Sequence, residues 1–279
     1  MEAKLTEWGL DGSLLDPTHF ARRMQILDQL EILFASGRGQ ASYSPDLVNT
    51  ARDFIAKLES ANTLLFESIR CQIQTGICPA EFVAIMRDLV TPPLGLAYDY
   101  LDDLLAGVFQ FEPPTEEPRP LDPDSVFYQP TPARHIFHLI TAAAITSTDT
   151  LIDLGSGLGH VPLLVSICTG ATSIAIELDP TWVASARKCA DSLNLRNATF
   201  RVEDARETDL SSGNVFYLYT PFGGSILAIV FDALRKQAAR RPIRICTFGP
   251  CTAAVSKQPW LQPLTPPTTD RITVFLPRP

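Results

Sequence analysis

The stretch Thr150–Asp179, TLIDLGSGLGHVPLLVSICTGATSIAIELD, decides how the second half of the chain is expected to fold. A short apolar run at its start predicts a buried strand, and a glycine-rich turn, GSGLG, follows at residues 155–159. A helix-length apolar segment comes next, and a second apolar run then ends on Glu177. Strand, tight turn, helix and a strand ending in an acid form the unit that opens a nucleotide-binding α/β sheet.

The glycines of this turn allow the backbone to turn sharply and to approach a ligand closely, because they lack a Cβ atom. The free N–H groups of the turn and of the following helix then point toward that ligand. Gly155, Gly157 and Gly159 read G-x-G-x-G, and His160 stands where a dinucleotide fingerprint, G-x-G-x-x-G, has its third glycine. The spacing therefore disfavours NAD.

The stretch DLGSGLG, residues 153–159, resembles the first motif of class I S-adenosylmethionine (SAM) methyltransferases. Glu177 resembles the family's acid after the second strand, which accepts hydrogen bonds from the ribose hydroxyls. Asp204 resembles the acid after the third strand, which faces the adenine. Residues 219–222 fall at the motif after the fourth strand, beside the transferable methyl group. The resemblance implies SAM as cofactor and S-adenosylhomocysteine as product.

A further segment, VFYQPTPARHI at residues 126–136, is similar to one found before the first motif in certain bacterial methyltransferases. Those proteins are related to lysine methyltransferases of the Dot1-like and ATP-synthase c-subunit-like kinds. The resemblance as a whole covers residues 126–279. It implies an α/β fold: a doubly wound, Rossmann-like, seven-stranded methyltransferase sheet closed by an antiparallel pair, expected at residues 259–264 and 271–276.

The cofactor contacts implied by the resemblance come from the glycine turn, the strand ends and the segment before the turn. Tyr128 would close over the methionine end and Thr131 would donate to its carboxylate, although a buried linker tyrosine is an equal alternative. Asp153 would either hold the methionine moiety or support the turn. Asp204, with the Ala205 N–H, would read the adenine edge; the alternative is an N-cap for the segment after the third strand, and the two roles are compatible. The expected set is Tyr128, Thr131, Asp153, Gly155, Ser156, Gly157, Gly159, Glu177, Leu178, Asp204 and Ala205.

The motif after the fourth strand departs from the family. Relatives that methylate amines often place Asn or Asp there, followed by two prolines and an aromatic residue. Here the residues are Tyr219, Thr220, Pro221 and Phe222, and they are the expected catalytic set. A backbone carbonyl could replace the missing acceptor, and aromatic rings could hold a cation. A plain turn after a strand is the alternative.

Residues 1–110 are expected to form a helical domain. Apolar residues recur there at helical spacing, with start signals at Asp16-Pro17 and Ser44-Pro45, and Leu94–Phe109 is expected to be its last helix. Residues 111–124 are rich in proline and are expected to form a stiff linker. The methyltransferase domain then occupies residues 125–279, with a helix at 131–145 leading into it.

The net charge of −8 is unevenly distributed, with −11 in residues 1–125 and +3 in residues 126–279. An acidic first half argues against a nucleic-acid partner. No run of about 18 apolar residues predicts a membrane span, and the first residues lack the apolar core of a signal peptide. Six scattered cysteines without a C-x-x-C pattern favour a cytoplasmic protein. His135 and His138 lie three residues apart, but no ligand partners at motif spacing suggest a metal.

Two functions follow from these sequence features. One is an enzyme that transfers a methyl group from SAM to an amine-type acceptor, either a protein lysine or a small molecule. The other is a non-catalytic SAM-binding protein that acts as a regulatory or interaction module through its helical half. The substituted motif at residues 219–222 favours the second, and the cofactor motifs fit both.

Overall fold

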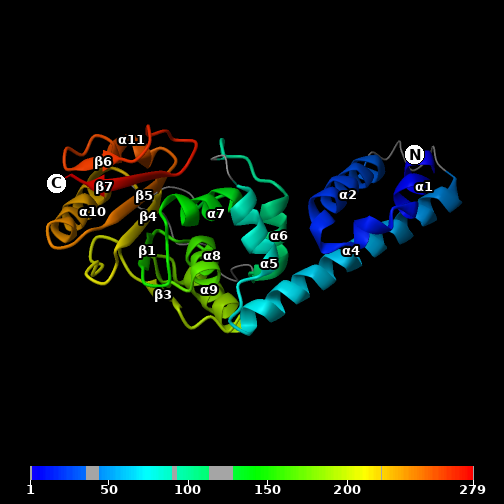
Figure 1. Ribbon diagram of the computed structural model, residues 1–279, viewed down its shortest axis with the longest axis horizontal. Helices are drawn as coiled ribbons and strands as arrows, with labels where there is room; N and C mark the ends of the chain where they lie inside the picture. The colour runs from blue at the N-terminus through cyan, green and yellow to red at the C-terminus, as the bar shows by residue number, and fades with distance from the viewer. Residues whose placement is uncertain (1, 36–43, 90–92, 113–127, 221, 279) are drawn as a thin grey trace.

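The computed structural model describes residues 2–35, 44–89, 93–112, 128–220 and 222–278. Helices of the first part of the chain lie at one end of the molecule and the sheet lies at the other, with one long helix, α4, running between them (Figure 1). The expected linker, residues 111–124, lies outside the described residues except for 111 and 112. The described helices are α1 (Glu2–Leu10), the 3-10 helices η1 (Gly12–Leu15) and η2 (Pro17–His19), α2 (Phe20–Ala35), α4 (Pro45–Gln74), α5 (Ala80–Asp88), α6 (Tyr100–Phe109), α7 (Ala133–Ala142), α8 (His160–Thr169), α9 (Pro180–Ser192), α10 (Gly224–Ala238) and α11 (Cys251–Val255).

One mixed sheet of seven strands has the order β3-β2-β1-β4-β5-β7-β6 within the described residues. The first five strands are parallel, and β7 runs antiparallel to both β5 and β6. The order reverses between β1 and β4, which places the ligand-binding switch point of a doubly wound sheet at their carboxyl ends. The expected α/β methyltransferase-type fold and its closing antiparallel pair are confirmed. The strands are β1 (Thr150–Leu154), β2 (Thr172–Glu177), β3 (Ala198–Val202), β4 (Val215–Tyr219), β5 (Arg244–Phe248), β6 (Leu261–Pro263) and β7 (Thr273–Pro277).

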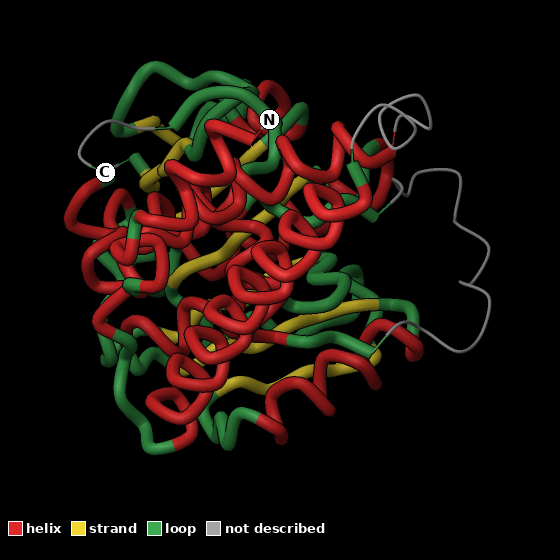
Figure 2. Tube along the Cα trace, turned by 90° about the vertical axis from the view of Figure 1, so that its right-hand side faces the viewer, coloured by secondary structure: helices red, strands yellow, loops and turns green. Residues whose placement is uncertain are grey.

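Successive strand residues point to opposite faces of the sheet, and each face is covered by its own helices. Leu151 and Tyr217 belong to the apolar cluster that contains residues of α7, α8 and α9. Their neighbours Ile152 and Phe216 belong to the cluster that contains α10 and α11. Figure 2, which looks from the side of the N-terminal helices, shows the helical layers in front of the strands.

Capping side chains mark the starts of η2, α4 and α9. Asp16 accepts a hydrogen bond from the Thr18 N–H and caps η2, which leads directly into α2. Ser44 accepts from the Leu47 N–H and caps α4, with Pro45 in the first turn. Asp179 accepts from the Thr181 N–H in the same way before α9. These caps satisfy N–H groups that have no partner inside the helix.

The prediction of a helix at Leu94–Phe109 is wrong for residues 94–99, because α6 begins only at Tyr100. Asp99 accepts from the Leu101 N–H, and the Asp102 carboxylate accepts from the Asp99 N–H, so the two form a capping box. Residues 94–99 are therefore outside the helix. The helix expected at residues 131–145 is likewise shorter, because α7 spans Ala133–Ala142.

Residues of α4 belong to two different apolar cores. Leu58 packs with residues of α1, η1 and α2 in a small core. Leu65, about two helical turns later on α4, belongs instead to the large core. That core includes α5, α6 and the α7–α9 side of the sheet. The second half of α4 and the helices α5 and α6 therefore share a core with the sheet. Hydrogen bonds from Arg70 and Gln74 to Ser192 tie the end of α4 to the end of α9.

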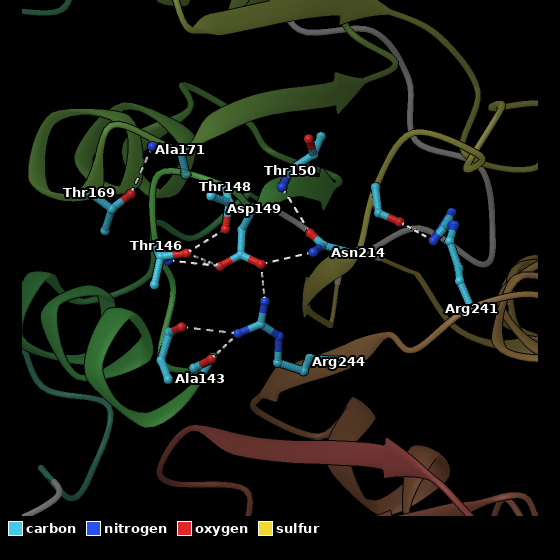
Figure 3. A network of polar contacts seen from close by, with 12 residues as sticks. Ala143, Thr146, Thr148, Asp149, Thr150, Thr169, Ala171, Asn214, Arg241 and Arg244 are labelled. Atoms are coloured by element: carbon cyan, nitrogen blue, oxygen red, sulfur yellow. Dashed lines mark hydrogen bonds and ion pairs between the residues drawn. The ribbon is translucent and has the colours of Figure 1, made fainter.

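A polar network joins β1, β4, β5 and the end of α7 at the amino ends of the strands (Figure 3). Asp149 accepts hydrogen bonds from the Thr146 N–H, from Asn214 and from Arg244. Asn214 also accepts from the Thr150 N–H, and Arg244 donates to the carbonyl of Ala143. This edge lies opposite the carboxyl ends, so the network supports the fold and leaves the site edge free.

Candidate active site

The turn after β1 has the backbone that its glycines predict. Gly155, Gly157 and Gly159 all have positive φ, at 84°, 53° and 79°. The N–H groups of Gly155 and Ser156 donate to the Ile176 carbonyl, at 2.8 and 3.0 Å, which ties the turn to the end of β2. Because L-residues rarely adopt positive φ, other residues at these three positions would strain the turn.

Glu177, at the end of β2, lies beside this turn. Its Oε2 accepts from the Gly157 N–H at 2.9 Å, and its Oε1 accepts from the N–H groups of Leu178 and Asp179. A carboxylate oxygen offers two acceptor positions, so Oε2 can still accept one further donor, such as a ribose hydroxyl. The structure thus brings the predicted acid and the predicted glycine turn together.

Tyr128 covers the turn from above the glycines. A Cβ atom at Gly157 would come within 1.9 Å of the Tyr128 ring, so the ring packs directly on the backbone. The Tyr128 ring also packs at a tilt against Trp182, with ring centroids 4.7 Å apart, and its hydroxyl lies 3.2 Å from Nδ1 of His160. Burial raises the pKa of the Tyr128 phenol well above its ordinary value, so the hydroxyl stays neutral. Trp182 and His160 are neighbours that sequence reasoning did not assign to the site.

Asp153 and Thr131 lie deeper, under the carboxyl edge. Asp153 is 3% exposed, and burial, followed by the negative charge of Glu177, raises its pKa well above the ordinary value. Thr131 is 6% exposed and its hydroxyl is 2.8 Å from the hydroxyl of Tyr217 on β4. Asp153 and Tyr217 are register partners on adjacent strands. In this structure Thr131 therefore uses its hydroxyl inside the protein, although the sequence suggested a contact with the cofactor.

Asp204 follows β3, as expected, but its carboxylate is occupied by a residue of its own loop. The Arg206 guanidinium donates to both carboxylate oxygens, and the Arg206 N–H donates to Oδ1 at 2.8 Å. The capping alternative for Asp204 is therefore present in the structure. Reading an adenine amino group would require Asp204 to release Arg206. Ala205 is partly buried against the α10 side of the sheet.

The expected catalytic residues lie at the end of β4 and directly after it. Tyr219 packs on Phe248 at the end of β5, with ring centroids 4.8 Å apart. Burial, together with the nearby phenol of Tyr98, raises the pKa of Tyr219 to about 12, so it is a neutral donor or acceptor near pH 7. Thr220 has a φ of +41°, and Phe222 is 6% exposed in the apolar core. Pro221 lies outside the described residues.

Residues 94–99, for which the sequence predicted a helix, lie at the carboxyl edge of the sheet. Gly95 donates its N–H to the Asp270 carbonyl before β7, and its own carbonyl is 2.7 Å from Nε2 of His135. The Tyr98 hydroxyl donates to the carbonyl of Pro130, next to Thr131. Two features of the sequence point to this arrangement: the capping box at Asp99 and the helix-breaking Gly95. The prediction of a helix over residues 94–109 gave more weight to the helical spacing of the apolar residues.

His135 and His138 both lie on α7. His135 is completely buried, with its ring 4.3 Å from that of Phe248, and its Nδ1 has no hydrogen-bond partner. Burial lowers its pKa to about 4, so the imidazole is neutral. Among the described residues, no three His, Cys, Asp or Glu side chains are grouped as metal ligands.

The residues around the turn fit a nucleoside cofactor of the expected kind. Glu177 keeps an acceptor position beside the turn, and the Ser156 hydroxyl is buried without a partner in the protein. Such an unpaired buried hydroxyl is costly unless a ligand or water completes it. The ring of Tyr128 adds an apolar and aromatic surface over the same turn.

No described helix is both long enough and sufficiently apolar to cross a membrane.

No model of a protein family matches the chain, and a search of curated proteins gives no match. Solved structures do resemble part of it. An RNA methyltransferase from Salinibacter ruber in complex with S-adenosyl-L-homocysteine is 27% identical, with 53% of this chain and 92% of that chain covered and a TM-score of 0.41. A precorrin-6y C5,15-methyltransferase from Geobacter metallireducens is 14% identical, with 53% and 90% covered and a TM-score of 0.42. A tRNA (uracil-54, C5)-methyltransferase from Pyrococcus abyssi, in complex with S-adenosyl-L-homocysteine, is 14% identical, with 53% and 39% covered and a TM-score of 0.42.

Proposed function

We propose that the protein is a class I SAM-dependent methyltransferase that transfers a methyl group to an amine-type acceptor. The observation that carries the proposal is the bond between Glu177 and the N–H of Gly157, which joins the acid of β2 to the glycine turn of β1. This pair lies at the carboxyl ends of a sheet with the order β3-β2-β1-β4-β5-β7-β6. An acid, a left-handed glycine turn and a switch point together are the elements of a nucleoside site.

The cofactor would be held by the turn and by the residues that surround it. Glu177 would accept from the ribose, the Ser156 hydroxyl would gain a partner, and Tyr128 would cover the ligand. Asp204 with Ala205 would read the adenine after the release of Arg206. When bound, SAM would supply a methyl group already activated by its sulfonium, so the protein mainly has to position the acceptor and exclude water.

The acceptor would lie beside Tyr219 at the end of β4. Its phenol is neutral and would offer a hydrogen-bond acceptor, and a backbone carbonyl of the motif would offer a second uncharged one. Tyr98, which lies near enough to affect the pKa of Tyr219, would form the facing wall. The residues thus suit a nitrogen that is neutral when it reacts, and the aromatic rings would favour the positive charge that this nitrogen gains on methylation.

The kind of molecule that carries this nitrogen is a finer question. The resemblance of residues 126–136 to lysine methyltransferase relatives supports a protein lysine, and a small molecule is the second option. The acidic first half argued against nucleic acid, but this expectation does not fit the RNA methyltransferase among the similar structures. RNA therefore joins the acceptors to be tested. The scattered free cysteines support a cytoplasmic location.

A non-catalytic SAM-binding protein is the second candidate, favoured by one observation. The first position of the motif after β4 is Tyr219, where amine-methylating relatives often have an amide or a carboxylate. A regulatory protein would need the cofactor site and could dispense with that acceptor side chain.

Calorimetric titration with SAM, S-adenosylhomocysteine, NAD and ATP tests the cofactor. We expect the first two to bind more tightly, because the turn lacks the third glycine of a dinucleotide site. Equal or tighter binding of NAD would overturn the assignment. Release of S-adenosylhomocysteine from SAM with a cell extract, divided into protein, RNA and small-molecule fractions, then separates the enzyme from the regulatory protein and identifies the acceptor class. Binding without turnover in any fraction favours the regulatory protein.

A further inference from the structure

Thr220 has a backbone conformation that its side chain disfavours. Its φ of +41° lies in the left-handed region, which is uncommon for any residue with a Cβ atom and exceptional for a β-branched one. It directly follows Tyr219, at the end of the strand that borders the switch point. Strained residues persist only where their surroundings fix them, and they concentrate at functional sites.

The surroundings of Thr220 supply such a restraint. Its hydroxyl accepts from the Cys251 N–H at 3.0 Å and lies 3.4 Å from the Phe248 carbonyl, to which it can donate. In return, the Thr220 N–H donates to Sγ of Cys251 at 3.3 Å. These contacts fasten the end of β4 to the segment that follows β5.

The same segment fixes the ring of Tyr219. The ring packs on Phe248, and a Cβ atom at Gly249 would lie 2.8 Å from the Tyr219 ring and 2.9 Å from the Thr220 hydroxyl oxygen. The backbone after β5 therefore passes directly against both residues. If Thr220 turned to an ordinary φ, its hydroxyl would leave Cys251, and the carbonyl of Tyr219 would change direction.

We propose that Thr220 is a positioning residue, whose hydroxyl holds the turn after β4 so that Tyr219 stays at the point of methyl transfer. The proposal rests on the function proposed above, and it replaces the direct catalytic contact that the sequence suggested for Thr220. The hydroxyl acts through Tyr219 and has no contact with the cofactor turn. Cofactor affinity and the placement of Tyr219 should therefore be separable.

The test compares three variants of the full chain with a matched control. Thr220→Val keeps the branched shape and removes the hydroxyl, Thr220→Ser keeps the hydroxyl, and Thr220→Gly removes the hydroxyl and the strain together. The control is Thr169→Val at the end of α8, because the Thr169 hydroxyl also accepts from a backbone N–H, that of Ala171 at 3.0 Å, and donates to a carbonyl, that of Val165. Each protein carries 3-fluorotyrosine at position 219 for ¹⁹F NMR and is titrated with S-adenosylhomocysteine.

We expect Thr220→Val and Thr220→Gly to shift or broaden the fluorine line, while Thr220→Ser and Thr169→Val leave it as in the parent protein. S-adenosylhomocysteine affinity should stay within about twofold in all four. With an extract that supports turnover, kcat should fall about tenfold or more in Thr220→Val, with KM for SAM unchanged, and recover in Thr220→Ser.

An unchanged fluorine line in both Thr220→Val and Thr220→Gly would overturn the proposal and leave Thr220 a purely structural residue. Thr220→Gly makes this outcome readable even if Thr220→Val does not fold, since glycine tolerates positive φ. If the parent protein fails to bind S-adenosylhomocysteine, the proposed function fails, whereas the fluorine line still decides whether Thr220 positions Tyr219.

Discussion

Glu177 has two tasks in this structure, and both depend on one carboxylate. It accepts three backbone N–H groups, from Gly157, Leu178 and Asp179, and it keeps an acceptor position for a ribose. A carboxylate held in this way is already oriented before a ligand arrives, so little freedom is lost on binding. The sequence predicted the ligand contact from the strand end, whereas the support of the glycine turn became visible only in the structure.

We predict that Glu177→Ala weakens S-adenosylhomocysteine binding by about 1.5–3 kcal/mol, the loss expected for a charge-assisted hydrogen bond. Glu177→Gln, which retains one carbonyl oxygen, should lose less. Calorimetry gives the affinities, and Glu207→Ala, at an exposed acid of the loop after β3, serves as the control. Normal binding by folded Glu177→Ala would remove the ribose role.

His135 makes stability depend on pH in a predictable direction. Burial lowers its pKa to about 4, from an ordinary value of 6.5, so the folded protein keeps it neutral while the unfolded chain binds a proton. The contribution of His135 to the free energy of unfolding is therefore fully present above pH 6.5 and is lost as the pH drops toward 4. Arg134, His138 and Asp270 are the charged or titratable groups that act on it.

We predict that His135→Gln, which can still donate to the Gly95 carbonyl, unfolds with a weaker dependence on pH than the parent protein. At pH 5 the difference in pH-dependent loss should approach about 2 kcal/mol, since each tenfold difference in proton affinity between the folded and unfolded chain corresponds to about 1.4 kcal/mol. Denaturant unfolding at pH 7.5 and pH 5 measures it. Asp153 has a raised pKa, so its contribution to stability changes with pH in the direction opposite to that of His135. Because both proteins contain Asp153, the comparison between them removes this contribution. Parallel curves would show that His135 is protonated within the fold.

At the scale of elements, the network at the amino ends of the strands holds the sheet in register. Burial alone would raise the pKa of Asp149, but hydrogen bonds from Thr146 and Asn214 and the charge of Arg244 outweigh it and hold this pKa below its ordinary value. The Asp149 side chain is 7% exposed and that of Arg244 is 23% exposed. Loss of Arg244 would therefore leave a largely buried carboxylate without its cation.

We predict that Arg244→Met destabilises the protein by about 2–4 kcal/mol, somewhat less than the 3–5 kcal/mol typical of breaking a fully buried pair. Arg240→Met, at an exposed arginine just before β5, should change stability by about 0.5 kcal/mol or less. Thermal and denaturant unfolding measure both. Equal effects would mean that Arg244 contributes no more than a surface charge.

Sequence patterns predicted those helices and strands that are determined by residues close to each other in the chain. Apolar runs with an acid or a glycine at their ends indicated the strands, and Ser44 and Asp179 indicated helix starts, because capping needs only neighbouring residues. Contacts between distant segments could not be predicted in this way. Residues 94–99 are fixed by Asp270 and His135, which lie far along the chain, and the ring of Tyr128 reaches Gly157 only through the tertiary fold.

The whole molecule is organised around α4, which belongs to two cores. A division at the proline-rich residues 111–124 follows from composition, and it remains a proposal. The packing suggests a further division inside α4, between Leu58 and Leu65. Ile136 and Phe137 on α7 are completely buried in the large core, which α5 and α6 share. The helices next to the linker thus act as a covering layer of the sheet.

We predict that a shortened chain of residues 60–279 folds and binds S-adenosylhomocysteine within about tenfold of the full chain, or roughly 1.4 kcal/mol. It keeps the large core except for Phe20 and the partly buried Met24, and Ser60 can cap the new start of α4. A chain of residues 121–279 should fail to fold, because it exposes the α7 face and burial is worth about 1.5–3 kcal/mol for each large apolar side chain.

Circular dichroism melting establishes folding for both chains, and calorimetry follows for those that melt cooperatively. A folded chain of residues 60–279 that has lost S-adenosylhomocysteine binding would mean that the removed helices help to hold the cofactor. A chain of residues 121–279 that folds and binds normally would place the boundary at the proline-rich segment, because the shared core would then add stability without being required. The chain of residues 60–279 keeps residues 94–99 together with their hydrogen bonds to Asp270 and His135. It should therefore also keep Tyr98 facing Tyr219, and hence turnover with the extract.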